Sequence, residues 1–203
     1  SITLNETLEI KKDMTLCLNG CTITGAKASI TINVAANNTF VLTDCNSGGM
    51  LKYNGEKNSQ HVGVYVDDGS FTMYHGTVDG FTDGVRARGS GATFAMYGGS
   101  IVNNRDCGVY SSGTFEMYGG KITGNGRDTY NALTGCGVYM SGTMTVGGDA
   151  VIQNNYSNSG NAQNVYWRSY KNNQPIPITV EDSFTGSFGV TAFNWPSPGK
   201  QIQ

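Results

Sequence analysis

Two carboxylates and an arginine are the residues of this sequence best suited to catalysis. Asp83 and Asp106 occupy nearly equivalent places in two copies of a repeated segment, and Arg86 follows Asp83 closely. Glycoside hydrolysis requires two carboxylates at a defined separation, one of them with a raised pKa. Asp83, Asp106 and Arg86 are therefore the candidate catalytic residues, grouped in a small cleft. The same residue types also hold turns through ion pairs, and the sequence leaves both interpretations open.

Tyrosine recurs in two rows that are suited to binding. A residue that lies between two inward-facing positions of a strand points outward. Such residues form a first row, Tyr65, Arg86, Tyr110, Tyr139 and Tyr166, and a second row, Tyr74, Tyr97 and Tyr118. Aromatic rings with polar edges suit sugars or a protein partner, and arginine binds acidic groups of a glycan. The alternative is structural, because stacked tyrosines stabilise neighbouring strands by ~0.2–1 kcal/mol per pair.

The five cysteines match no zinc-binding pattern, and we expect neither a metal nor another cofactor. Cys21 and Cys45 lie 24 residues apart, and Cys107 and Cys136 each directly precede a Gly-Val pair. Each pair is expected to stack in neighbouring turns, either as a disulfide or as two buried thiols. Cys17 is left without a partner.

Short repeated strands must position all of these residues. A Gly-Val-Tyr strand is followed by a Phe-x-Met-Tyr strand at a period near 22 residues, which is typical of a β-solenoid. Upstream, residues 15–18 align with residues 39–42 at a spacing of 24. Alternation within the strands predicts two internal columns. These columns contain Phe71, Phe94, Phe115 and Met144, and Val64, Val85, Val109, Val138 and Val165.

We therefore expect an all-β protein, a single-stranded right-handed parallel β-helix of about seven turns that forms one domain over residues 1–203. Residues 1–12 are expected to cap the N-terminal end, and residues 13–174 to form the turns. Residues 175–203 contain all four prolines and Trp195, and they are expected to close the other end. With no initiator Met and no secretory signal, the chain is expected to be a piece of a larger protein.

Composition narrows the classes of function. The 203 residues include 29 glycines, charged residues make up only 14%, and the net charge is −2. This balance gives no basic surface for nucleic acid. No window approaches the ~18 consecutive apolar residues of a transmembrane helix. We expect a monomer with no nucleic-acid partner and no membrane insertion.

Three sets of motifs carry a resemblance to a known superfamily. Residues 16–25 read Leu-Cys-Leu-Asn-Gly-Cys-Thr-Ile-Thr-Gly, residues 40–45 read Phe-Val-Leu-Thr-Asp-Cys, and the Gly-Val-Tyr copies follow. In these motifs the chain resembles the right-handed parallel β-helix, or pectate-lyase-like, superfamily. More narrowly, it is similar to Gly-rich β-helix repeat domains of bacterial secreted and cell-wall-anchored surface proteins. Hydrolases of this superfamily share four short motifs, of which the chain has only the Asp-Asp pair, at Asp67-Asp68.

The resemblance implies an extracellular or bacterial cell-surface setting. The expected function is adhesion or glycan recognition, with a glycan or a host or cell-surface protein as partner, or service as a rigid stalk. The alternative is a polysaccharide lyase or glycoside hydrolase. The incomplete set of catalytic motifs favours the functions without catalysis.

Overall fold

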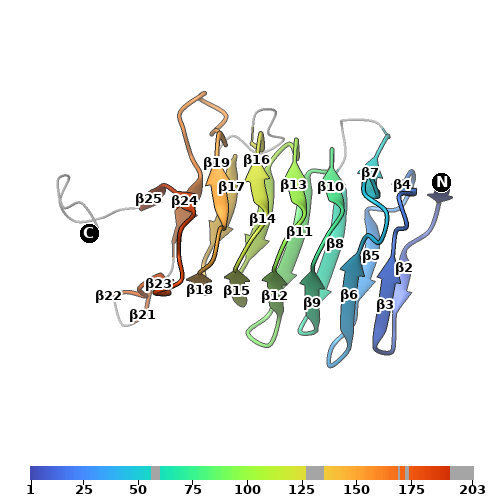
Figure 1. The fold of residues 1–203 in the computed structure, drawn as a ribbon, viewed down its shortest axis with the longest axis horizontal. Coiled ribbons are helices and arrows are strands. Elements are labelled where there is room, and N and C mark those ends of the chain that lie inside the picture. Colours follow the sequence, from blue (N-terminus) through green and yellow to red (C-terminus); the bar gives the residue numbers. More distant parts are fainter. Residues whose placement is uncertain (56–59, 127–134, 169, 172–173, 193–203) are drawn as a thin grey trace.

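The computed structural model describes residues 1–55, 60–126, 135–168, 170–171 and 174–192. These residues form no helix, and their strands wind into a parallel β-helix whose first and last strands lie at opposite ends (Figure 1). Successive strands enter three sheets in turn, here called sheets A, B and C. The expected fold, an all-β parallel β-helix of about seven turns, is confirmed, because each sheet contains seven or eight described strands.

The strands are short, and they are named here by sheet. Sheet A contains β1 (Ile2–Leu4), β4 (Thr22–Gly25), β7 (Met50–Tyr53), β10 (Thr77–Asp79), β13 (Ser100–Val102), β16 (Lys121–Thr123), β19 (Val151–Gln153) and β24 (Ser187–Phe188). Sheet B contains β2 (Leu8–Ile10), β5 (Ile30–Val34), β8 (Val62–Asp67), β11 (Asp83–Arg88), β14 (Cys107–Ser111), β17 (Cys136–Met140), β20 (Val165–Trp167) and β25 (Val190–Ala192). Sheet C contains β3 (Met14–Cys17), β6 (Thr39–Thr43), β9 (Ser70–Met73), β12 (Thr93–Met96), β15 (Thr114–Met117), β18 (Thr143–Val146) and β23 (Thr179–Val180). A separate antiparallel pair consists of β21 (Tyr170–Lys171) and β22 (Gln174–Pro175).

Both ends of the described chain take part in the turns. Strands β1 and β2 pair in parallel with β4 and β5, so most of residues 1–12 belongs to the first turn. Strands β23, β24 and β25 continue the three sheets at the other end, where Val190 lies opposite Val165. Trp195, which was expected to help close this end, lies outside the described residues.

The two predicted internal columns are present. Phe71, Phe94 and Phe115 are fully buried, and their ring centroids lie 4.9 and 5.2 Å apart along the stack. Met144 follows Phe115 in register, and Phe40 extends the column on the other side. The second column contains Val64, Val85, Val109, Val138 and Val165. The repeats therefore align as the sequence predicts from β8 onward.

An asparagine ladder fills the corner between sheets A and B. The Nδ2 of Asn104 donates to Oδ1 of Asn125, and the Nδ2 of Asn125 donates to Oδ1 of Asn155, both at 2.9 Å. The three side chains are buried. A Cβ on Gly108 would lie 2.9 Å from Nδ2 of Asn125, and one on Gly137 would lie 2.5 Å from Nδ2 of Asn155. Gly108 and Gly137 therefore make room for the ladder, whereas Gly63 of the first copy faces Phe81.

The register near the N-terminus differs from the prediction. Met14 lies opposite Phe40 in sheet C, so the spacing there is 26 residues instead of 24. In sheet A, Thr22 lies opposite Met50, a spacing of 28. The loop of residues 44–49 is thus two residues longer than the equivalent loop one turn earlier, and it carries Cys45.

Candidate functional site

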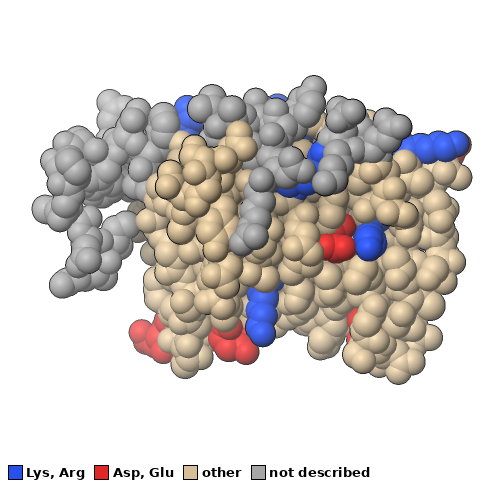
Figure 2. Space-filling view, turned by 90° about the horizontal axis from the view of Figure 1, so that it is seen from above, with Lys and Arg blue, Asp and Glu red and all other residues tan. Residues whose placement is uncertain are grey.

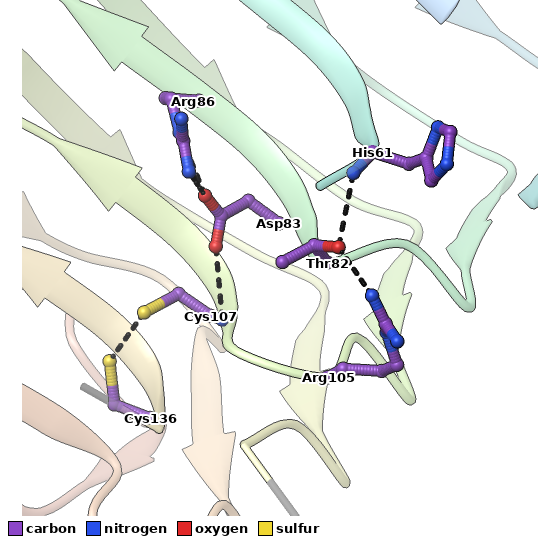
Figure 3. A network of polar contacts seen from close by, with 7 residues as sticks. All are labelled: His61, Thr82, Asp83, Arg86, Arg105, Cys107 and Cys136. Carbon is purple, nitrogen blue, oxygen red and sulfur yellow. Dashed lines mark hydrogen bonds and ion pairs between the residues drawn. The ribbon is translucent and has the colours of Figure 1, made fainter. Parts of the chain in front are cut away.

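Two of the three candidate catalytic residues, Asp83 and Arg86, are in contact on strand β11 of sheet B (Figure 3). The Nε of Arg86 donates to Oδ2 of Asp83 at 2.8 Å, and a second guanidinium nitrogen contacts the same oxygen. The backbone N–H of Cys107 donates to the other carboxylate oxygen at 3.1 Å. Asp106 is 8% exposed and directly precedes Cys107. The structure thus brings Asp83 and Arg86 together, and it places Asp106 in the neighbouring turn, next to the residue that donates to Asp83.

Its arrangement favours a structural role over catalysis. The side chain of Asp83 is completely buried, so a polymeric substrate has no access to it. Burial raises the pKa of Asp83, while Arg86 and the N–H of Cys107 act in the opposite direction. The Arg86 guanidinium is held by Asp83 and lies 5.5 Å from the centroid of the Tyr110 ring. It is thus engaged within the protein, which speaks against the role of Arg86 as a receptor for acidic groups.

A second group of hydrogen bonds, centred on Thr82, lies next to Asp83 at the corner that precedes β11. The backbone N–H of His61 and the Nη2 of Arg105 both donate to the hydroxyl of Thr82, at 3.1 and 2.8 Å (Figure 3). Thr82 is 1% exposed. This group of hydrogen bonds ties three consecutive turns together, since the three residues come from successive copies of the corner.

Cys107 and Cys136 stack in neighbouring turns as predicted. Their sulfurs lie 3.0 Å apart and both side chains are fully buried, as a pair of thiols (Figure 3). Burial raises the pKa of both, that of Cys107 well above its usual value. The two thiols pack against Tyr139 in a cluster separate from the main core. Of the two arrangements left open, the structure contains the thiol stack.

The predicted pairing of Cys21 with Cys45 is wrong. Cys45 is bonded to Cys17, with Cα atoms 6.2 Å apart, and Cys21 is an exposed free thiol. The register explains the difference. Ile10 lies opposite Val34 at a spacing of 24, but Met14 lies opposite Phe40 at a spacing of 26, so the connection before β6 is two residues longer than its equivalent one turn earlier and shifts Cys45 out of register with Cys21.

The first tyrosine row has the predicted register but is not an exposed ridge. Tyr110 and Tyr139 stack with ring centroids 4.5 Å apart, and Tyr166 lies 5.6 Å beyond Tyr139. Tyr139 is only 6% exposed, and Nη1 of Arg168 donates to its hydroxyl at 3.4 Å. Tyr65 is half-buried and lies opposite Arg86. The outward direction of this row was predicted correctly, but its exposure was not.

The second tyrosine row is the accessible one. Tyr74 and Tyr97 are 43% and 47% exposed, and Tyr118 is half-buried. Successive ring centroids are 5.2 Å apart, with interplanar angles of 16° and 22°. The ring faces are thus turned toward one another, and the hydroxyls and ring edges are turned toward solvent. Tyr74 and Tyr97 are two of the four large apolar residues that are exposed in the described chain.

Sequence reasoning missed a shallow groove at the corner that follows the strands of sheet A. It has a volume of about 480 Å³ and is bordered by Asn103, Thr123, Asn154 and Tyr156. Asn103 and Asn154 adopt left-handed backbone conformations, with φ of 54° and 57°. A signal was present, since each asparagine follows a sheet A strand by one residue, where the neighbouring copies have Gly80 and Gly124. In an Asn-rich chain this signal does not stand out.

Charged side chains are few on the face that Figure 2 shows. In that view from above, a small number of Lys, Arg, Asp and Glu side chains, some of opposite sign side by side, lie on a largely uncharged face. Among the described residues, no group of three or more His, Cys, Asp or Glu side chains is placed to hold a metal. No described helix has the length and apolar character to span a membrane.

Comparisons with known proteins identify no relative of this chain. No family model matches the chain. No curated protein and no solved structure matches it either.

Proposed function

We propose that this chain is a binding module of a bacterial surface protein and that it recognises a glycan through the second tyrosine row. The observation that carries the proposal is the exposure of Tyr74 and Tyr97, because every other Phe, Tyr or Trp side chain whose burial the structure describes is buried or half-buried. Exposed aromatic groups lower solubility unless they serve contact. Tyrosine combines an apolar ring with a hydroxyl, which suits the mixed apolar and polar surface of a sugar.

The geometry of the row favours a linear ligand that runs along the solenoid axis. The three rings repeat at 5.2 Å, one per turn, and they offer one hydroxyl per turn. Their faces are turned toward one another, so the polymer meets hydroxyls and ring edges along the row. The exposed parts of the three tyrosines provide at most roughly 300 Å² of surface, well below the ~800 Å² per partner of a stable protein interface. A saccharide chain therefore fits the row better than a second copy of the protein.

Two further features support a surface setting. The disulfide between Cys17 and Cys45 is of the kind that persists in oxidising compartments outside the cytosol. The motifs described above resemble β-helix repeats of the pectate-lyase-like superfamily in bacterial surface proteins, and we infer that the chain belongs with them. A regular solenoid also serves as a rigid spacer, which is compatible with presenting a binding row away from the cell.

A polysaccharide-active enzyme is the competing function. Its best catalytic candidate, Asp83, is completely buried and bonded to Arg86. A carboxyl group that acts on a polymer must reach the glycosidic oxygen. The enzyme would be favoured over the binding module if the chain turned over a polysaccharide and the Asp83→Asn variant lost this turnover but still bound the polysaccharide.

The direct test is a glycan array with the purified chain and two matched variants. Tyr97→Ala removes the central ring of the exposed row, and Tyr65→Ala makes the same substitution in the first row. We expect Tyr97→Ala to weaken binding of the best glycan about tenfold, the ~1.4 kcal/mol of one aromatic anchor, with Tyr65→Ala close to the parent protein. Circular dichroism shows whether both variants stay folded. Full binding by Tyr97→Ala, or no glycan bound by the parent, would contradict the proposal.

A further inference from the structure

We propose that the second tyrosine row ends in a subsite for an ammonium group, so that the glycan it binds is a polymer of amino sugars with free, protonated amines. This inference rests on the proposed function and names its ligand class. It concerns the C-terminal end of the row, at Tyr118.

The row ends because the next copy has Gly147 where the preceding copies have tyrosine. Val146 lies opposite Met117, so Gly147 lies opposite Tyr118. A Cβ on Gly147 would lie 3.0 Å from Cδ1 of Tyr118 and 2.7 Å from Oε2 of Glu181. The missing side chain thus lets a carboxylate and an aromatic ring come together at the same point. Glu181 is exposed and Tyr118 is half-buried, so both are accessible.

The position of the carboxylate is set by its neighbours. The hydroxyl of Ser183 donates to Oε2 of Glu181, and it accepts from the backbone N–H of Gly148, each at 3.4 Å. The backbone N–H of Glu181 donates to the carbonyl oxygen of Val146 at 2.9 Å, which fixes the residue next to strand β18. Glu181 forms no ion pair with a described lysine or arginine, so its charge is open to a ligand.

The charge around Tyr118 selects the ligand. Burial raises the pKa of Tyr118, and the negative charges of Glu116 and Glu181 raise it further. Asp149 adds a third carboxylate, since its Oδ1 would lie 2.9 Å from a Cβ on Gly119. A cation beside an aromatic ring and a carboxylate gains from both, whereas an acidic sugar is repelled. Among common polysaccharides, those with free amino groups supply such a cation at every residue.

The test compares two oligosaccharides that differ only in acetylation. Isothermal titration calorimetry is run with a glucosamine hexamer and with an N-acetylglucosamine hexamer of the same linkage. We expect the glucosamine hexamer to bind about three- to tenfold more tightly at low salt, as one exposed cation–π contact and one exposed ion pair allow. Raising the salt concentration should reduce this preference.

Two variants localise the effect. Glu181→Gln should abolish the preference for the free amine, while Asp182→Asn, an exposed acid one residue away, should keep it. Equal binding of the two hexamers by the parent, or a preference that survives Glu181→Gln, would overturn the ammonium subsite. If the ammonium subsite is overturned but neutral glycans still bind in a way that depends on Tyr97, the proposed function is retained. Absence of any glycan binding would overturn both.

Discussion

Replacement of Asn125 by alanine tests whether the asparagine ladder holds the turns together. Asn125 lies in the middle of the ladder and is completely buried. Its Oδ1 accepts from both the backbone N–H and the Nδ2 of Asn104, each at 2.9 Å. Its Nδ2 donates to Oδ1 of Asn155 at 2.9 Å and to the carbonyl oxygen of Ile101 at 3.1 Å. The Nδ2 also donates to the carbonyl oxygen of Thr123 at 3.1 Å. Alanine removes all five contacts at once.

The expected loss follows from the groups left behind. Two buried N–H donors of Asn104 lose their acceptor, at ~1–3 kcal/mol each, so we expect the free energy of unfolding to fall by about 2–6 kcal/mol. The matched control is Thr123→Ala, which changes a half-buried residue of the same corner. A substitution of this kind, away from a buried network, should stay within about 0.5 kcal/mol.

The assay is urea unfolding followed by circular dichroism and by tyrosine fluorescence. Coincidence of the two transitions shows whether a single free energy of unfolding is defined for the chain. Asn125→Asp provides a second variant that keeps an acceptor for Asn104 but loses the donor toward Asn155, and it should also be destabilised. If Asn125→Ala costs no more than Thr123→Ala, the ladder only fills space, and the reasoning from its hydrogen bonds fails.

Two further predictions concern ionisation and thiol chemistry. The backbone N–H groups of Gly20 and Gly49 each lie 2.7 Å from the carboxylate of Asp44, and these contacts hold the pKa of Asp44 below its ordinary value. The ionised Asp44 therefore stabilises the fold above pH ~4, and this stabilisation is lost as the pH falls through the pKa of the folded state. The stability gap between the parent and Asp44→Asn, measured by urea unfolding, should be present at pH 7 and shrink at pH 3; an unchanged gap would contradict this. Thiol titration of the unfolded, unreduced protein should find three free thiols, Cys107 and Cys136 among them, and five after reduction. One free thiol before reduction would mean that Cys107 and Cys136 are bonded.

Regular repetition made most of the fold predictable. Phe71, Phe94 and Phe115 recur with the same neighbours on either side, so one alignment fixes the register of all three sheets from β8 onward. The same alignment placed Cys107 opposite Cys136. It failed at Cys45, because the copies near the N-terminus have diverged and the connection before β6 is two residues longer than its equivalent one turn earlier.

The asparagine ladder was not predictable from alternation, because alternation is interrupted where it forms. A Cβ on Gly84 would lie 2.8 Å from Nδ2 of Asn104, and Val85 is fully buried, so two consecutive residues face the interior. A side chain of any size at Gly84 would collide with the ladder. In the sequence, asparagines of this corner are indistinguishable from asparagines of exposed turns, since both follow a strand and both are polar.

The two tyrosine rows show that direction and exposure are separate properties of a residue. Both rows point away from the core, as alternation predicts. In the first row, Arg86 lies over the Tyr110 ring, and the buried Cys107 and Cys136 pack with the tyrosines in a second, smaller core. The second row lies at the end of sheet C, followed by Gly98 and Gly119, which supply no side chain to cover it. The same repeat therefore produces one row that packs against a small core of its own and one row whose first two rings remain exposed to solvent.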